Sequence, residues 1–400
     1  TGSSPAAAAA TAASASAAVD AAGGTVSAWL QVASDGSAFS MPGTQSIRYG
    51  DGVHWVVKSV AGPATCTAAY FGSDPAPWKS KSCEQQVTVP AVTQSGMAPV
   101  INLALVPGAA ASYTTSRVRA LSAAELTSST FLPSPTDVGA FREVCGYSHL
   151  AFDDPIAHPG APGASHLHTF VGNDSTSASS TASSLATSGG STCAGGTLNR
   201  TGYWMPTLVD VRTGQPVLPT GSIVYYKLGY RGVQAASVVP FPAGLRIIAG
   251  SASGSPSAPS IGAFACLNGG SWQPTVPNCA VGDTIRATVT FPQCWDGVNL
   301  DSPDHKSHME YATAGKGCPA DHPVALPEIS ISFDYMNTEA NLGASLKLSS
   351  DNYAGAGGFS LHADWFNGWD PATLQDFVGN CIVANKDCHA YLLGDGNILY

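Results

Sequence analysis

Charged side chains are scarce in this sequence. Only 17 Lys and Arg and 27 Asp and Glu occur among its 400 residues, which is 11% of the chain, whereas a typical globular domain has roughly 25%. The net charge of −10 leaves no cationic surface for a phosphate backbone, because nucleic acids are bound chiefly through Lys and Arg. The composition therefore excludes nucleic acid as a partner.

Long hydrophobic runs are missing as well. The nearest one, residues 97–111, is interrupted by two prolines, an Asn and a Gly, so it falls short of the roughly 18–20 apolar residues that a membrane-spanning helix requires. We expect no membrane span. The sequence also contains no P-loop, no strand-linked dinucleotide fingerprint and no Gly-x-Ser-x-Gly elbow, so we expect no nucleotide cofactor and no α/β-hydrolase chemistry.

Cysteine spacing excludes two common kinds of cysteine site. No two of the ten cysteines form a Cys-x-x-Cys pair, which argues against a zinc ribbon or a thioredoxin-type redox site. An even number of cysteines instead favours disulfides and an oxidising compartment. We therefore expect five disulfides in a secreted, extracellular protein, with Cys66–Cys83 and Cys381–Cys388 as pairs of cysteines close in sequence.

The chain divides into four parts by composition. The first, residues 1–22, is almost wholly Ala, Ser, Thr and Gly and predicts a tether. Residues 23–115 carry short alternating or β-branched runs separated by turn dipeptides such as Asp35-Gly36, which predict a small N-terminal β-sandwich. Residues 116–135 predict a linker, and residues 136–400 a larger domain that carries the site. The strands expected in the sandwich are residues 25–32, 46–49, 53–60, 64–71, 85–89 and 100–106.

The larger domain shows little helical periodicity. Its best helix is the short segment 371–378, which Asp370 precedes as N-cap and which has Pro at its first position. The Ser/Thr/Ala/Gly tract 175–191 predicts a flexible surface loop. The fold class expected for the chain is all-β, with a loop-rich, disulfide-pinned second domain that resembles a sandwich or a jelly roll. Its clearest strands are residues 223–228, 245–249, 284–290 and 328–333.

Histidines occur in three short clusters. His166 and His168 are two residues apart, so on a strand both would point to the same face. His362 and Asp364 repeat this spacing, and His305 and His308 form a third pair. Neutral imidazoles with a carboxylate are ligands for zinc or copper. Loop hydrogen bonds explain one isolated pair better, but three clusters in one domain make a shared site at least as good an explanation. A copper brace on an N-terminal histidine is disfavoured, because no His precedes His54. The ligands expected for a divalent metal are His166, His168, His308, His362 and Asp364.

Carboxylates and aromatic residues share these motifs. Paired carboxylates cleave glycosidic bonds as acid and base or nucleophile, and a His base beside a cation eliminates across uronides. The alternative is that each Asp only stabilises a turn. Flat aromatic rings suit the C–H faces of sugars, unless they are simply core residues. The catalytic candidates are His166, His168, Asp301, Asp304, His305 and His308. The substrate-binding candidates are Tyr203, Trp204, Trp295, Trp365 and Asn367.

Four of these segments together resemble a known family. They are Ser165–Asn173, Gly202–Leu208, Phe291–His308 and Leu361–Trp369, which are similar in order to the motifs of the DUF1996 family of secreted fungal and bacterial proteins. The resemblance extends over about residues 141–388, and Ala363 stands where the family pattern leads us to expect Gly. Fungal members are often joined to carbohydrate-binding WSC modules, so the resemblance implies a cell-wall or polysaccharide setting without naming a reaction.

The sequence thus predicts a secreted protein that acts on extracellular polysaccharide. The expected activity is that of a glycoside hydrolase or polysaccharide lyase, with a His/Asp cluster that holds zinc, copper or no metal at all. The alternative is a non-catalytic cell-surface protein that binds a metal or a glycan through the same histidines.

The cysteine pattern generates a first testable prediction. All ten cysteines should be oxidised in the native protein, and removal of one native bridge should lower the free energy of unfolding by roughly 2–5 kcal/mol. Mass spectrometry of the unreduced protein, alkylated under denaturing conditions, measures this directly. Alkylation at several of the ten positions would contradict both the pairing and the compartment.

Overall fold

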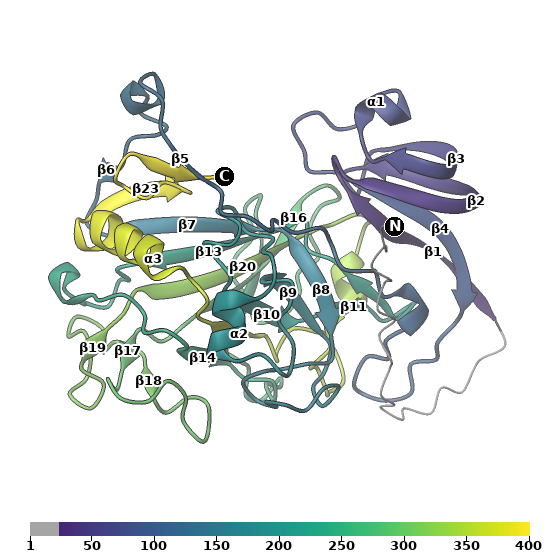
Figure 1. Ribbon diagram of the computed structural model, residues 1–400. Coiled ribbons are helices and arrows are strands. Elements are labelled where there is room, and N and C mark those ends of the chain that lie inside the picture. The colour runs from purple at the N-terminus through teal and green to yellow at the C-terminus, as the bar shows by residue number, and fades with distance from the viewer. Residues whose placement is uncertain (1–23) are drawn as a thin grey trace, which may run out of the picture.

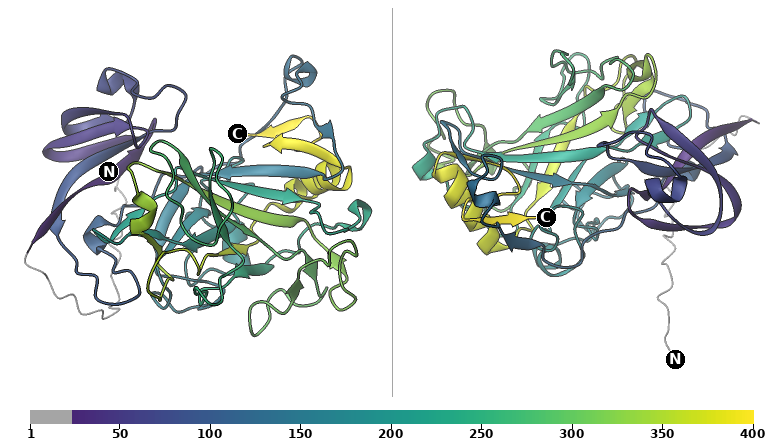
Figure 2. Two further views of the ribbon diagram at one scale, coloured as in Figure 1. Left: turned by 180° about the vertical axis from the view of Figure 1, so that it is seen from behind. Right: turned by 90° about the horizontal axis from the view of Figure 1, so that it is seen from above.

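The computed structural model describes residues 24–400, and the tether expected for residues 1–22 lies outside these described residues. Strands form six sheets, while helices are few and short, so the prediction of a mostly β fold is confirmed. Within the described chain no helix is long and apolar enough to cross a membrane. Figures 1 and 2 show the N-terminal sheet beside a larger body formed by the rest of the chain.

The N-terminal part is one antiparallel sheet, where two packed sheets were expected. Its strand order is β1-β4-β2-β3, and the helix α1 packs on one face, where Phe71 stacks on Tyr49 with ring centroids 5.2 Å apart. The predicted Cys66–Cys83 disulfide is present and lies in this core. The elements are β1 (Thr25–Ser34), β2 (Ala38–Gly50), β3 (Trp55–Thr65), α1 (Ala68–Phe71) and β4 (Ser82–Pro90).

Two segments predicted as strands adopt helical turns. The end of segment 64–71 forms α1, because the Thr67 side chain accepts a hydrogen bond from Tyr70 N and Gly72 ends the helix at φ 94°. Segment 100–106 contains the 3₁₀ turn η1 (Leu103–Leu105), which Asn102 caps by accepting from Ala104 N. Local side-chain caps thus override the apolar pattern in both places.

Two large sheets pack face to face in the larger body, with the main core between them (Figure 1). In the seven-stranded sheet the order is β15 (Ala263–Cys266), β16 (Thr284–Thr290), β20 (Glu328–Met336), β13 (Gly221–Lys227), β7 (Ala140–Cys145), β23 (Lys386–Ala390) and β6 (Ser134–Pro135). In the five-stranded sheet it is β14 (Arg246–Gly250), β22 (His362–Phe366), β10 (Gly202–Pro206), β9 (His168–Gly172) and β8 (Tyr147–Ala151).

Smaller elements surround these sheets. The predicted helix is confirmed as α3 (Pro371–Phe377), whose N-cap Asp370 accepts from Thr373 N at 2.9 Å and which continues into the π-helical turn η5 (Val378–Val383). The remaining strands are β5 (Val118–Ala120), β11 (Leu208–Asp210), β12 (Gln215–Val217), β17 (Cys294–Trp295), β18 (Met309–Glu310), β19 (Val324–Ala325), β21 (Leu346–Leu348) and β24 (Asn397–Leu399). The remaining helical turns are η2 (Glu125–Thr127), α2 (Ala182–Thr187), η3 (Ala235–Ser237) and η4 (Leu342–Ser345).

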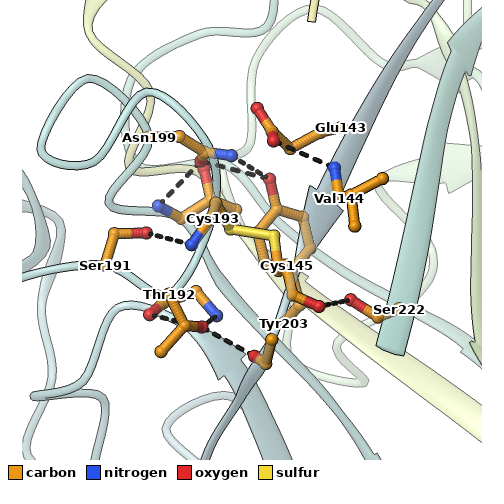
Figure 3. The surroundings of a disulfide bond; sticks show 12 residues. Glu143, Val144, Cys145, Ser191, Thr192, Cys193, Asn199, Tyr203 and Ser222 are labelled. Atoms are coloured by element: carbon orange, nitrogen blue, oxygen red, sulfur yellow. Dashed lines mark hydrogen bonds between the residues drawn. A yellow bond between two sulfur atoms is a disulfide. The ribbon is translucent and has the colours of Figure 1, made fainter. Parts of the chain in front are cut away.

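Disulfides join all ten cysteines, as predicted. Cys381–Cys388 forms as expected, and the other bridges are Cys145–Cys193, Cys266–Cys279 and Cys294–Cys318. Figure 3 shows Cys145–Cys193 beside the buried Tyr203, with Ser222 Oγ donating to the carbonyl oxygen of Cys145 at 2.9 Å. This bridge ties the end of β7 to the segment that leads into β10, so it links the two large sheets.

Residues 116–135, expected to be a linker, pair with the C-terminal end of the chain. β5 pairs with β24, and β6 pairs with β23. The buried Leu121 belongs to the main core. Just upstream, Tyr113 forms two backbone hydrogen bonds with Ser191. We therefore propose that the larger body begins near residue 108.

This boundary can be tested by truncation. A chain of residues 108–400 should unfold cooperatively, whereas one of residues 136–400 loses β5, β6 and the Leu121 contact. Its melting temperature should therefore be lower by at least about 5 °C, since each kcal/mol shifts a body of this size by roughly 2–4 °C. Calorimetry of both chains checks the prediction. Equal melting temperatures would show that residues 108–135 are only a connector.

Candidate functional site

The candidate site lies on the outer face of the five-stranded sheet, away from the main core. Alternate residues of β22 divide between the faces: Ala363 and Trp365 enter the main core, whereas His362 and Asp364 point to the other side. Trp204 of β10 pairs with Asp364, and His168 of β9 pairs with Pro206 two residues further along β10. Both histidines therefore start their strands at the same end of the sheet.

Three imidazoles meet at this end. The ring centroids of His166 and His168 are 4.2 Å apart, and the His362 ring lies 5.0 Å from the first and 5.8 Å from the second. One ring nitrogen from each residue lies within 4.8 Å of the others. His168 and His362 are 0% and 3% exposed, whereas His166 is half-buried, so His166 lies on the side of the group that is nearer the solvent.

Backbone carbonyls fix the orientation of two of these rings. His168 Nδ1 donates to the carbonyl oxygen of Asp153 at 2.9 Å, and His362 Nδ1 donates to that of Ser360 at 2.8 Å. A proton on Nδ1 leaves a lone pair on Nε2. Nε2 of His166 and Nε2 of His168 are buried without a hydrogen-bond partner. This arrangement is the one that metal-ligating histidines usually adopt.

Two buried carboxyl groups adjoin His168. One oxygen of Asp154, one of Asp364 and a His168 ring nitrogen lie within 4.8 Å of one another. Asp154 Oδ1 accepts from the backbone N–H groups of Ile156 and Ala157 at 2.8 Å each, but neither oxygen of Asp364 has a hydrogen-bond partner. We call His166, His168, His362, Asp154 and Asp364 the His/Asp cluster.

Burial controls the protonation of this cluster. Burial, followed by the charges of neighbouring histidines, holds the pKa of His166 well below its usual range and lowers that of His362 to about 4. Burial also lowers the pKa of His168. For Asp364, burial and then the charge of Asp154 raise the pKa well above 3.8. At neutral pH the imidazoles are therefore uncharged and have lone pairs to donate.

The segment 175–191, expected to be a flexible loop, is an ordered cover over the same sheet face. The helix α2 begins with a capping box between Thr181 and Ser184. Leu185 packs in the small core formed with Trp204 and Phe366. Asn173 Nδ2 lies 3.4, 3.1 and 3.2 Å from three backbone carbonyl oxygens, two of them in this segment. The segment is therefore ordered despite its polar composition, because the Asn173 side chain bonds to its backbone carbonyl oxygens.

Four predicted catalytic residues lie in a tight surface turn, residues 301–308, and do not join the cluster. Asp301 bonds His305 Nδ1 at 2.9 Å and Arg246 at 3.1 Å. Asp304 accepts from the backbone N–H of Lys306 and of Ser307, and the Ser307 contact is the chief cause of its lowered pKa. These groups stabilise the turn itself, as the turn-chemistry alternative stated.

His308, expected to be a metal ligand, is likewise held elsewhere. Its Nδ1 bonds Ser302 Oγ at 2.9 Å, and its Nε2 bonds the carbonyl oxygen of Arg246 at 2.7 Å. Arg246 lies four residues along β14 from Gly250, the partner of His362, which is about 13 Å of strand. Both the distance and the occupied ring nitrogens remove His308 from the ligand set.

The predicted substrate-binding residues are mostly core. Tyr203 Oη bonds Tyr226 Oη at 2.8 Å, and Trp365 Nε1 donates to that same oxygen at 3.2 Å, so both hold the two large sheets together. Trp204 is fully buried beneath the cluster. Trp295 is half-buried, with Nε1 donating to the Asn299 carbonyl oxygen, and Asn367 donates to that of Pro242. Three of the four aromatic residues, Tyr203, Trp204 and Trp365, are fully buried.

Sequence reasoning missed Asp153, Asp154 and Lys306. Asp153 and Asp154 precede a proline and look like turn residues, which they also are, and only the fold places Asp154 beside Asp364. Lys306 lies inside the Phe291–His308 motif, but we predicted its neighbours His305 and His308 as site residues instead. The donor set that remains, three neutral imidazoles beside carboxylates, suits a divalent transition metal, zinc first.

Comparison with known proteins gives one family. The model described as "Domain of unknown function (DUF1996)" matches residues 154–369, more than half of the chain. All members of the His/Asp cluster fall within this match, whereas the N-terminal sheet lies outside it. No solved structure matches the chain.

The unpartnered Asp364 generates a stability prediction. Because its folded-state pKa is raised, the metal-free protein loses stability as the pH rises above the unfolded value. Asp364→Asn should therefore raise the free energy of unfolding of chelator-treated protein at pH 8 by about 1–3 kcal/mol, with the gain fading toward pH 4. Urea unfolding at both pH values measures it.

Asp304→Asn serves as the control of opposite sign. This exposed carboxylate has a lowered pKa, so its removal should decrease stability at pH 8. If Asp364→Asn also destabilises the metal-free protein at pH 8, Asp364 is not an uncompensated buried acid.

Proposed function

The chain belongs to the DUF1996 family, and we propose that it is a secreted metalloenzyme that cleaves polysaccharide at a zinc-type centre held by His166, His168 and His362. The supporting observation is the convergence of three imidazoles on one point: the half-buried His166 before β9, and the buried His168 of β9 and His362 of β22. Five disulfides support an oxidising, extracellular setting.

The proposal of a bound metal rests on buried polar atoms that have no hydrogen-bond partner. An isolated buried polar group costs free energy unless something satisfies it, and an ionised carboxylate costs far more. Four ligand-type atoms are buried here without partners: Nε2 of His166 and of His168, and both oxygens of Asp364. A bound divalent cation satisfies all four, either directly or through a coordinated water. Three histidines with one open position are the ligand pattern of catalytic rather than structural zinc.

The carboxyl groups give this centre an acid–base partner. A bound zinc ion lowers the pKa of coordinated water to about 7. One oxygen of Asp154 and one of Asp364 lie within 4.8 Å of a ring nitrogen of His168. Asp364 is thus placed to take and return a proton beside the metal, while Asp153 and Ser360 keep two imidazoles correctly oriented.

Polysaccharide as the substrate rests on indirect support. The chain carries few charges, and the family resemblance implies a cell-wall setting. Hydrolysis and elimination both use a metal or a base beside the sugar ring. The second candidate, a metal-binding surface protein without turnover, is favoured by one observation: the unpartnered ligand atoms have almost no solvent exposure, as in closed structural sites.

Metal content is the direct test of the centre. Purified protein should hold close to one equivalent of zinc or copper by elemental analysis, and His168→Ala should lower both the metal content and the rate by at least about tenfold. Treatment with a chelator should reproduce the loss. His54→Ala is the matched control, because His54 lies in the N-terminal part with an exposed ring.

The products distinguish hydrolysis from elimination. New reducing ends indicate hydrolysis, and an unsaturated product absorbing in the ultraviolet indicates elimination. Metal binding with neither product, across a panel of polysaccharides, would favour the surface protein. Activity that survives both chelation and His168→Ala would refute the metal centre.

A further inference from the structure

The 301–308 turn is braced far more strongly than a surface turn requires. His308 is fixed by Ser302 and by the Arg246 carbonyl oxygen. His322 Nε2 donates to the Ser307 carbonyl oxygen at 3.0 Å. His305 adopts a left-handed backbone conformation with φ 57°, which is uncommon for a residue other than glycine and is often found at functional sites. These contacts hold the backbone on both sides of Lys306.

Lys306 extends from this turn to the His/Asp cluster. Its Nζ donates to the carbonyl oxygen of Gly250 at 2.5 Å, and Gly250 is the residue of β14 that pairs with His362. Burial is the main cause that lowers the pKa of His362 and raises that of Asp364, and the positive charge of Lys306 adds a little to the first shift and opposes the second. The ammonium group therefore lies at the edge of the cluster, on the β14 side.

Lys306 has capacity left for a ligand. The residue is exposed, and none of the ion pairs among residues 24–400 includes it. An ammonium group has three N–H donors, and one of them is used by Gly250. Six of the nine arginines of this chain are paired with carboxylates, whereas two of its eight lysines are. A free cation held at the edge of a buried metal-type cluster is a binding group for an anion.

We propose that Lys306 binds a carboxylate of the substrate, so that the site acts on a uronic-acid polysaccharide rather than a neutral one. This deepens the proposed function and rests on it. The remaining N–H donors of Lys306 make charge-assisted hydrogen bonds to the uronate, and this holds the sugar ring that carries it at the surface edge of the His/Asp cluster. The net charge of −10 makes a dedicated local cation necessary, because the protein as a whole repels a polyanion.

The test compares variants and ligands that differ by one charge. Binding of polygalacturonate, alginate and glucuronoxylan to the full chain is measured at low salt, each beside its methyl-esterified form. At least one polyuronate should bind, and Lys306→Met and esterification should each weaken that binding about tenfold. Lys306→Arg should retain it. Lys316→Met is the matched control, since Lys316 is an exposed lysine on another turn.

The outcomes separate this inference from the proposed function. Equal binding by Lys306→Met and the unaltered protein would overturn the inference, as would binding of neutral glucan but of no polyuronate. Metal content should be unchanged in all three lysine variants. Loss of metal in Lys306→Met would show a structural role instead. Absence of metal from every protein refutes the proposed centre, while the charge-selective binding can still be measured.

Discussion

The burial of Asp364 without a hydrogen-bond partner is the constraint on which the site depends. Its neighbours on the sheet face are Trp204 of β10 and Ile248 of β14, and the Nε1–H of Trp204 makes no hydrogen bond to it. Burying an uncompensated carboxylate works against folding, and disulfides with a large shared core provide the stability that tolerates it. Such an unfavourable group, next to three neutral imidazoles, would be compensated by the cation that we propose there.

The two faces of the five-stranded sheet have different roles. The inner face packs against the seven-stranded sheet, where Tyr203 and Trp365 meet at Tyr226 Oη. The outer face carries the cluster, covered by the segment around α2 and by the turn that begins at Asp153. Because side chains alternate along a strand, the same short motifs supply core and site. This explains why aromatic and ligand residues are interleaved in the sequence.

Sequence alone predicted the β class, the oxidised cysteines, two disulfide pairs and the helix at 371–378, because these depend on composition and on local spacing. The meeting of His166, His168 and His362 was expected from i,i+2 spacing on strands. The assignment of His308 and Asp304 could not be settled that way, since a His/Asp motif that braces a turn looks the same as one that binds a ligand. Only strand register separates them, by placing Arg246 and Gly250 four residues apart on β14. The position of Asp154 depended on the fold in the same way, because no local pattern brings this loop residue to Asp364 of β22.

The proposed metal lies at one point between three imidazoles. Anomalous diffraction from crystals of the full chain, recorded on both sides of the zinc and copper absorption edges, locates a metal without assuming any activity. We predict one strong anomalous peak about 2.0–2.2 Å from a ring nitrogen of each of His166, His168 and His362. Ordered water there, with no anomalous signal at either edge in crystals grown with added metal, would contradict it.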